Sequence, residues 1–151
     1  MKKPDSEIIS SIKDLMNSRH LAVLATCSES FPYTSLVGFA FSEDLKELYF
    51  ATFENTNKFR NLSEHPGVSL LVDSRENTAS DFKEARALTI LGKAESARES
   101  EMAEIQKLYL RRFPHLEDFV RDPACAMIKI TAEKYILVER FQEVTELEIK
   151  P

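Results

Sequence analysis

Asn57 and Lys58 have the residue types and the spacing that chemistry with an anion would use. They follow an expected strand at residues 47–52 and a short polar link, and a helical pattern begins at Asn57. The first N–H groups of a helix have no partner within it, and the helix dipole favours negative charge there. Asn55 or Thr56 can cap this helix, and Lys58 adds a cationic donor. The segment therefore predicts an anion site, with a plain surface turn as the alternative.

Other reactive patterns are missing from the chain. Its three glycines, Gly38, Gly67 and Gly92, do not form a dinucleotide turn or a phosphate loop. The three histidines are dispersed, without the spacing of metal ligands, and no Gly-x-Ser-x-Gly elbow occurs. No metal site and no catalytic residue are assigned, and chemistry carried by a bound cofactor fits the chain better.

The elements that must position this helix start are mostly short strands in hairpin order. Strands are expected at residues 20–27, 32–41, 46–52, 68–73, 85–97, 125–131 and 135–142, with 144–149 as a further candidate. Helices are expected at 6–17, 57–62, 99–112 and 116–121. The polar stretch 74–81 is the candidate for a mobile loop, either a disordered surface excursion, which is favoured, or a gate over a pocket. This order predicts an α+β domain built on an antiparallel β-barrel of about six strands or more with flanking helices.

Two of the expected strands, at residues 36–41 and 68–72, carry apolar side chains on both faces. An antiparallel sheet normally leaves one polar face to solvent. The second face is therefore covered by a helix, a ligand ring or another subunit.

Composition limits the class of protein. A chain of 151 residues with 43% hydrophobic residues suits one domain, residues 1–151. A net charge of −5 without a basic face does not favour nucleic acid or an anionic membrane as a partner. The amphipathic start and the lack of a long apolar run indicate no membrane span and a cytoplasmic protein. Cys27 and Cys125 are isolated in apolar stretches and are interpreted as reduced core residues.

The signature formed by residues 49–52, 57–58, 61–62 and 65–68 resembles the pyridoxamine 5'-phosphate oxidase-like flavoproteins. The resemblance extends over roughly positions 18–97 and more loosely over the tail. It implies a split β-barrel that binds FMN and forms a homodimer, with the flavin at the subunit interface. It also implies a phosphate-binding role for Lys58 and a flavin-lining role for residues 34–37. The cofactor contacts that it implies are Thr34, Ser35, Leu36, Val37, Ala51, Thr52, Asn57 and Lys58.

The chain departs from the oxidase proper at three places. No arginine stands at Tyr33-Thr34, Arg86-Ala87 replaces an Arg-Gln pair, and residues 139–144 lack the Arg and His of the substrate-binding segment. The tail at 135–141 is faintly similar to the haem-utilisation branch of the same fold, without its glycines and terminal histidine.

The leading hypothesis is an FMN-binding homodimer that acts as a small oxidoreductase on an unassigned small-molecule redox substrate. A second hypothesis is a non-catalytic flavin- or haem-binding protein for storage, sensing or electron transfer. A deazaflavin-dependent reductase of the same fold, and a cofactor-free barrel whose apolar faces form a dimer, are further alternatives.

Overall fold

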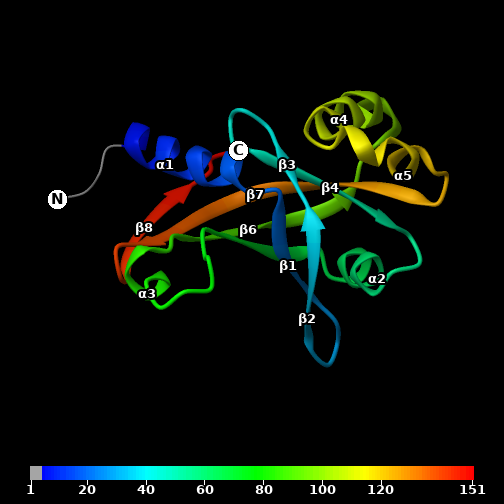
Figure 1. The fold of residues 1–151 in the computed structure, drawn as a ribbon. Helices are drawn as coiled ribbons and strands as arrows, with labels where there is room; N and C mark the ends of the chain where they lie inside the picture. Colours follow the sequence, from blue (N-terminus) through cyan, green and yellow to red (C-terminus); the bar gives the residue numbers. More distant parts are fainter. Residues whose placement is uncertain (1–4) are drawn as a thin grey trace.

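The computed structural model describes residues 5–151, which form one curled sheet with helices around it (Figure 1). The helices are α1 (Asp5–Ser18), α2 (Asn57–Glu64), α3 (Asp81–Glu84), α4 (Glu99–Arg112) and α5 (Glu117–Arg121), with a 3₁₀ turn, η1 (Pro114–Leu116), before α5. The strands are β1 (Leu21–Cys27), β2 (Pro32–Gly38), β3 (Ala40–Phe41), β4 (Glu47–Phe53), β5 (Gly67–Asp73), β6 (Ala87–Ser96), β7 (Cys125–Glu139) and β8 (Glu143–Glu148).

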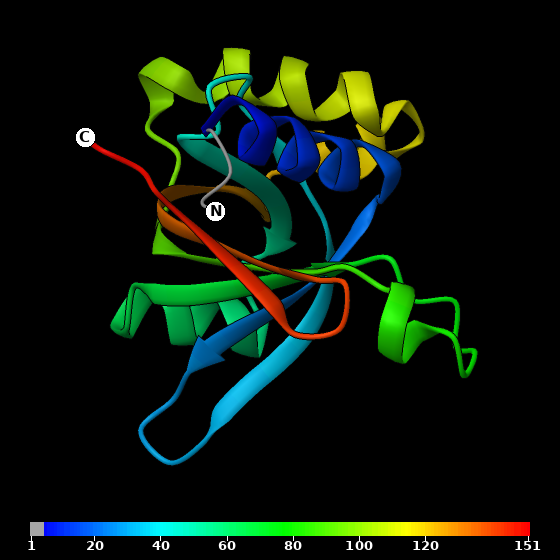
Figure 2. The ribbon, with the colours of Figure 1, turned by 90° about the vertical axis from the view of Figure 1, so that its left-hand side faces the viewer.

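All strand pairs are antiparallel, in the order β2-β1-β5-β6-β7-β4-β3, with β8 added beside β7. The sheet curls so that β2 packs against β4 although the two are not paired. The curl is visible in Figure 2, where α1 and α4 lie on one side and α2 lies on the other. The predicted α+β split barrel with flanking helices is confirmed.

The inner face of the sheet holds the main core, to which β1, β4, β5 and β7 contribute fully buried aliphatic and aromatic side chains. Helix α1 packs Ile8, Ile12, Leu15 and Met16 into this core, as the apolar spacing of its sequence predicts. A second cluster lies under α4 on the other face of β4 and β7. The helices therefore cover parts of both faces of the sheet.

Strand boundaries differ from the sequence expectation at two places. The expected strand at 32–41 is interrupted at Phe39, where the chain leaves β1 and joins β4. The expected strands at 125–131 and 135–142 are one continuous strand, β7, because its first half pairs with β4 and its second half with β8, while β6 pairs with both. A register shift at Leu91/Gly92 accompanies this bend.

The polar stretch at 74–81 is organised by one carboxylate. Asp81 accepts hydrogen bonds from the backbone N–H groups of Glu76, Asn77 and Thr78 at 2.8–3.3 Å, and α3 follows at once. These contacts hold the pKa of Asp81 below its usual value, with the Glu76 N–H as the largest cause. The short helix α3 was not expected from the sequence.

The interpretation of both cysteines as core residues is wrong for Cys27. Its side chain is exposed at the end of β1, and that of Cys125 is half-buried. Both thiols are free. Cys27 ends a strand next to a hairpin turn that projects beyond the sheet, so its apolar neighbours do not enclose it (Figure 1).

Candidate functional site

Helix α2 begins at Asn57, as predicted, and its N-cap is Thr56. The Thr56 side chain accepts a hydrogen bond from the Phe59 N–H at 3.3 Å, which satisfies one of the unpaired donors at the helix start. The same hydroxyl donates to Phe53 O at 3.0 Å and lies 3.0 Å from Thr52 Oγ1. The cap is therefore tied to the end of β4, and the helix start cannot move independently of the sheet.

Lys58 lies in the first turn of α2, where no acidic side chain is present. It is half-buried, and within residues 5–151 its ammonium has no hydrogen-bond or ion-pair partner. Asn57 is exposed, and its Oδ1 accepts a hydrogen bond from Arg60 at 3.1 Å. An unpaired cation beside the free N–H groups of a capped helix start is the geometry of an anion site.

The second part of the site is the junction where β2 and β4 lose their pairing. β3 pairs with β4 at Ala40↔Tyr49 and Phe41↔Leu48 only, while β2 is the end strand of the sheet order. The facing edges of β2 and of the last part of β4 therefore make no strand pairs with each other, although the strands are in contact. We call this unpaired junction the split. Those of its backbone donors and acceptors that have no other partner are available to a ligand.

The four predicted residues of β2 alternate along one side of the split. Leu36 is 67% exposed, Thr34 is exposed, and Val37 is buried. Ser35 lies opposite Leu24 on the inner face, and its Oγ is buried without a hydrogen-bond partner. A buried hydroxyl without a partner is energetically unfavourable, and a ligand carbonyl or ring nitrogen can supply the missing contact. This orphaned hydroxyl fits a polar ligand at the split.

Ala51 and Thr52 stand at the other side of the split, at the end of β4. Both are buried, and the Thr52 hydroxyl donates to Phe53 O at 3.1 Å in addition to its contact with Thr56. In this chain Thr52 thus acts on the helix cap, and through it on the start of α2.

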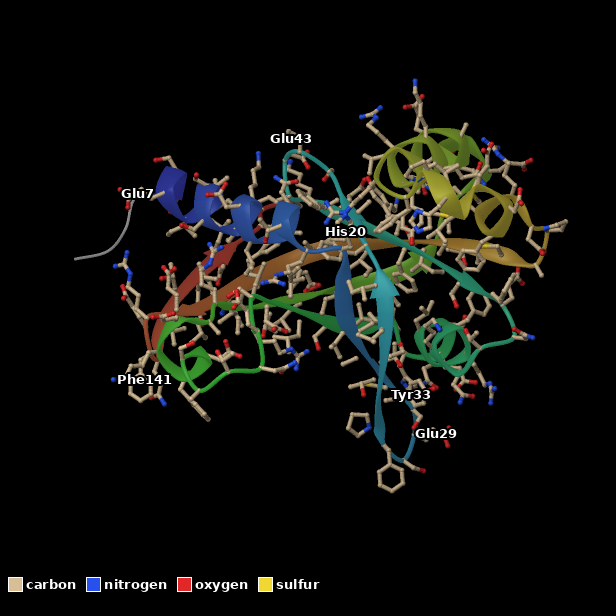
Figure 3. The ribbon with its side chains drawn as sticks, viewed as in Figure 1. Glu7, His20, Glu29, Tyr33, Glu43 and Phe141 are labelled. Carbon is tan, nitrogen blue, oxygen red and sulfur yellow. The ribbon has the colours of Figure 1, made fainter. Side chains whose placement is uncertain are left out.

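Asn61 holds α2 against the β1–β2 hairpin. The sequence pattern includes this residue but assigns no role to it. Its Nδ2 donates to Thr26 Oγ1 at 3.1 Å, and both side chains are buried. Thr26 Oγ1 lies 3.5 Å from the carbonyl oxygen of Tyr33, on the stretch of β2 next to α2 (Figure 3). The signal that could have revealed this role is an asparagine on the buried face of an amphipathic helix.

The structure thus brings the predicted residues together from three segments. The strand β2 with Thr34 to Val37 contacts β4, whose end carries Ala51 and Thr52, and it also contacts α2, whose first turn carries Asn57 and Lys58. The end of β4 and the start of α2 are close in sequence, so the sequence signature already placed them together. Strand β2 comes near them only because the sheet curls.

Nucleophilic chemistry has little support next to the end of β4. Cys125 pairs in register with Phe53, and burial raises the pKa of its thiol against the opposing effect of the Thr52 backbone. A thiol with a raised pKa stays protonated and is a poor nucleophile. Among residues 5–151, no group of three or more His, Cys, Asp or Glu side chains is placed to hold a metal ion. No helix of this part of the chain is long and apolar enough to cross a membrane.

Residues 8–139 match the family model described as pyridoxamine 5'-phosphate oxidase. No match was found among curated proteins.

Solved structures share the fold at low sequence identity. A haem-binding protein from Mycobacterium smegmatis has a TM-score of 0.83 at 15% identity, and the alignment covers 98% of this chain and 60% of that protein. A protein related to general stress protein 26, of the pyridoxinephosphate oxidase family, from Clostridium acetobutylicum has a TM-score of 0.74 at 17% identity, with 97% of both chains covered. An FAD-binding protein from Mesorhizobium loti has a TM-score of 0.68 at 15% identity, with 85% of this chain and 90% of that one covered. The chain thus spans less than two thirds of the mycobacterial protein, and these likenesses concern the fold alone.

Proposed function

The chain belongs to the pyridoxamine 5'-phosphate oxidase family, and from this premise we propose that it is a flavoprotein that binds FMN at the split and at the start of α2. The observation that carries the proposal is the unpaired ammonium of Lys58 in the acid-free first turn of a capped helix. A site of this kind suits a phosphate group better than any uncharged ligand.

The phosphate half of the proposed site consists of Lys58, Asn57 and the free N–H groups of the first turn of α2. Thr56 and Thr52 keep this turn in place, since their hydroxyl oxygens lie 3.0 Å apart and each lies within 3.1 Å of Phe53 O. The ligand therefore meets backbone donors that are already ordered, and ordering these N–H groups adds no entropic penalty on binding.

The ring half of the proposed site is the edge of β2 from Thr34 to Val37, facing Ala51. An isoalloxazine ring needs an apolar surface together with donors for its carbonyl oxygens and ring nitrogens. The exposed Leu36 offers apolar surface on the outer face, the unpaired strand edge offers polar contacts, and Ser35 Oγ is an unpaired hydroxyl on the opposite, inner face of the strand. When bound, the flavin supplies the capacity to accept and donate electrons, so the proposed activity is that of a small oxidoreductase.

A homodimer completes this proposal. The outer face of the sheet exposes apolar side chains from four strands that the register places on the same side. They are Leu21 and Val144, each 58% exposed, Leu36 at 67% and Leu91 at 38%. A second copy that covers this face would bury Leu36 beside the ring half and place the flavin at the subunit interface. Such a patch is what a protein–protein contact requires.

Haem binding is the second candidate function, and the likeness to the mycobacterial haem-binding protein favours it. A deazaflavin-dependent reductase and a non-catalytic flavin protein share the same site and differ from the leading proposal in ligand or in turnover. FAD is a further variant, in line with the protein from Mesorhizobium loti. A cytoplasmic setting, a small-molecule redox substrate and the absence of a nucleic-acid partner also belong to the proposal, supported by the free thiols and the acidic net charge.

The visible absorption spectrum of the purified protein tests the proposal. Flavin bands with FMN released on denaturation are expected, and FMN added to the apo-protein should raise Tm by mass action. A Soret band would identify haem instead, and released FAD or deazaflavin would assign those alternatives. Should FMN cause neither a spectral change nor a rise in Tm, the proposed function fails.

A further inference from the structure

The apex of the split is the point where strand pairing between the β2–β3 segment and β4 stops. Ala40 pairs with Tyr49, and the same antiparallel register continued by two residues would set Gly38 opposite Ala51. That pair is not made, because β2 turns toward β1 at Gly38. The carbonyl of the half-buried Gly38 and the N–H of the buried Ala51 therefore need another partner.

The hydroxyl of Tyr109 supplies that partner. It donates a hydrogen bond to Gly38 O at 3.0 Å, and Tyr109 packs in the same cluster as Ala51, whose backbone N–H lowers the pKa of the phenol against the larger effect of burial. Tyr109 comes from α4 and is 2% exposed, so water does not compete for these contacts. Tyr109 thus bonds to β2 and packs against β4 at the place where the backbone pair is missing, and so links the two strands at the apex.

The packing around this oxygen leaves little freedom. A Cβ atom at Gly38 would lie 3.2 Å from both the Tyr109 hydroxyl and the Phe113 ring, which is closer than most side chains come. The rings of Tyr109 and Phe113 are 4.9 Å apart, so they support each other. Glycine at position 38 therefore allows the β2 backbone to approach the phenol closely.

Helix α4 is itself held near both of its ends, by β7 at its first turn and by the end of α1 and the following link at its last turn. Glu101, in its first turn, accepts hydrogen bonds from the buried Lys129 of β7 at 3.0 and 3.1 Å. Arg112, in its last turn, donates to the carbonyl oxygens of Met16 and Arg19. The position of Tyr109 relative to β4 is therefore set by the fold and does not depend on a ligand.

We propose that Tyr109 is a positioning residue that fixes the distance between the facing edges of β2 and β4, and so determines how tightly the split holds the ring of a bound flavin. The inference rests on the proposed function. It assigns Tyr109 to the ring half alone, because its contacts are with Gly38 and Ala51, whereas Lys58 and the start of α2 form the phosphate half.

Tyr109→Phe removes the hydroxyl and keeps the ring, and Tyr135→Phe is its matched control. Tyr135 is also fully buried and donates to a backbone carbonyl, Leu45 O at 2.7 Å, but this contact joins β7 to the β3–β4 turn, away from the split. Fluorescence titration gives the Kd for FMN and for riboflavin in wild type and in both variants. Amide hydrogen exchange of the apo-proteins reports the split without any flavin.

For Tyr109→Phe, an increase in Kd of about tenfold is expected for FMN and riboflavin alike, since both carry the ring. Faster exchange of the Ala51 amide is expected as well, while Tyr135→Phe changes neither quantity at a comparable loss of Tm. The inference is overturned if both variants weaken flavin binding equally, if only FMN binding suffers, or if the Ala51 amide keeps its protection in Tyr109→Phe. Wild-type protein that binds no flavin would contradict the proposed function, whereas the exchange result would still decide whether Tyr109 closes the apex.

Discussion

Lys58→Ala tests the assignment of the phosphate half most directly. The ammonium is half-buried in the first turn of α2 and has no partner within residues 5–151, so its removal breaks no contact inside the protein. A hydrogen bond to a charged group contributes about 1.5–3 kcal/mol. Because Lys58 is partly open to solvent and the helix N–H groups stay in place, the lower part of this range applies. The Kd for FMN should therefore rise by about 10- to 30-fold.

Riboflavin provides the comparison, because it has the same ring and lacks the phosphate. Its Kd should stay within about twofold of the wild-type value in Lys58→Ala. Quenching of flavin fluorescence measures both constants, and repeating the titration with FMN in added salt should show a salt dependence that Lys58→Ala reduces. Lys93→Ala is the matched control, since Lys93 is an exposed lysine on β6 and its removal changes the net charge by the same amount.

Two results would refute the reasoning. Equal losses for FMN and riboflavin would mean that Lys58 supports the fold of the site and does not contact a phosphate. A loss of FMN affinity in Lys93→Ala as large as that in Lys58→Ala would mean that overall charge, and not a local contact, attracts the ligand.

Asn61→Ala removes a buried hydrogen bond between α2 and β1 and should lower the free energy of unfolding by about 1–3 kcal/mol, measured as a midpoint shift in urea; an unchanged midpoint would show that the contact is dispensable. Gly92→Ala should destabilise the fold by about 1–3 kcal/mol or more, because the new methyl group would lie 2.6 Å from a β7 carbonyl oxygen, whereas Gly67→Ala meets no atom within 4 Å and should leave Tm nearly unchanged; similar Tm values for the two variants would contradict this. The pKa of Glu101 is held below its ordinary value of 4.5, first by the Arg98 N–H and then by Lys129. The folded state thus favours the ionised carboxylate, so its stabilising effect is complete above the pKa of the unfolded chain and is lost as the pH falls through the lower pKa of the folded state. Glu101→Gln should therefore reduce the fall of Tm between about pH 5 and 3. An acid profile of Tm equal to that of wild type would argue against this role of Glu101.

Helix α4 shows what local sequence signals suffice to predict. Its bounds, Glu99–Arg112, agree with the sequence expectation because the apolar stripe has helical spacing and Pro114 prevents continuation. The start of α2 was equally predictable, since a capping Thr and a polar first turn are local features. The sequence left Asn55 and Thr56 as possible caps. In the structure the cap is Thr56, whose hydroxyl lies next to that of Thr52.

Strand β7 shows where such signals fail. The polar residues Glu133 and Lys134 suggest a break between two strands, yet the backbone continues through them. These side chains lie where the pairing of β7 with β4 ends and its pairing with β8 begins. Polar side chains at this position can face solvent without ending the strand. Whether a strand continues through polar residues depends on pairing partners that are distant in sequence, and the local alternation of side chains carries no information about those partners.

Local signals in the sequence were enough to predict the capped, lysine-bearing start of α2, because a helix cap, unpaired N–H groups and a nearby lysine are all set within a few residues. The contact between α2 and β2 and the hydrogen bond from Tyr109 to Gly38, 71 positions away in the chain, depend on the tertiary structure. Those contacts arise from the closure of the sheet, which is a property of long-range strand pairing and of the packing of α4, and no local pattern of residues specifies them.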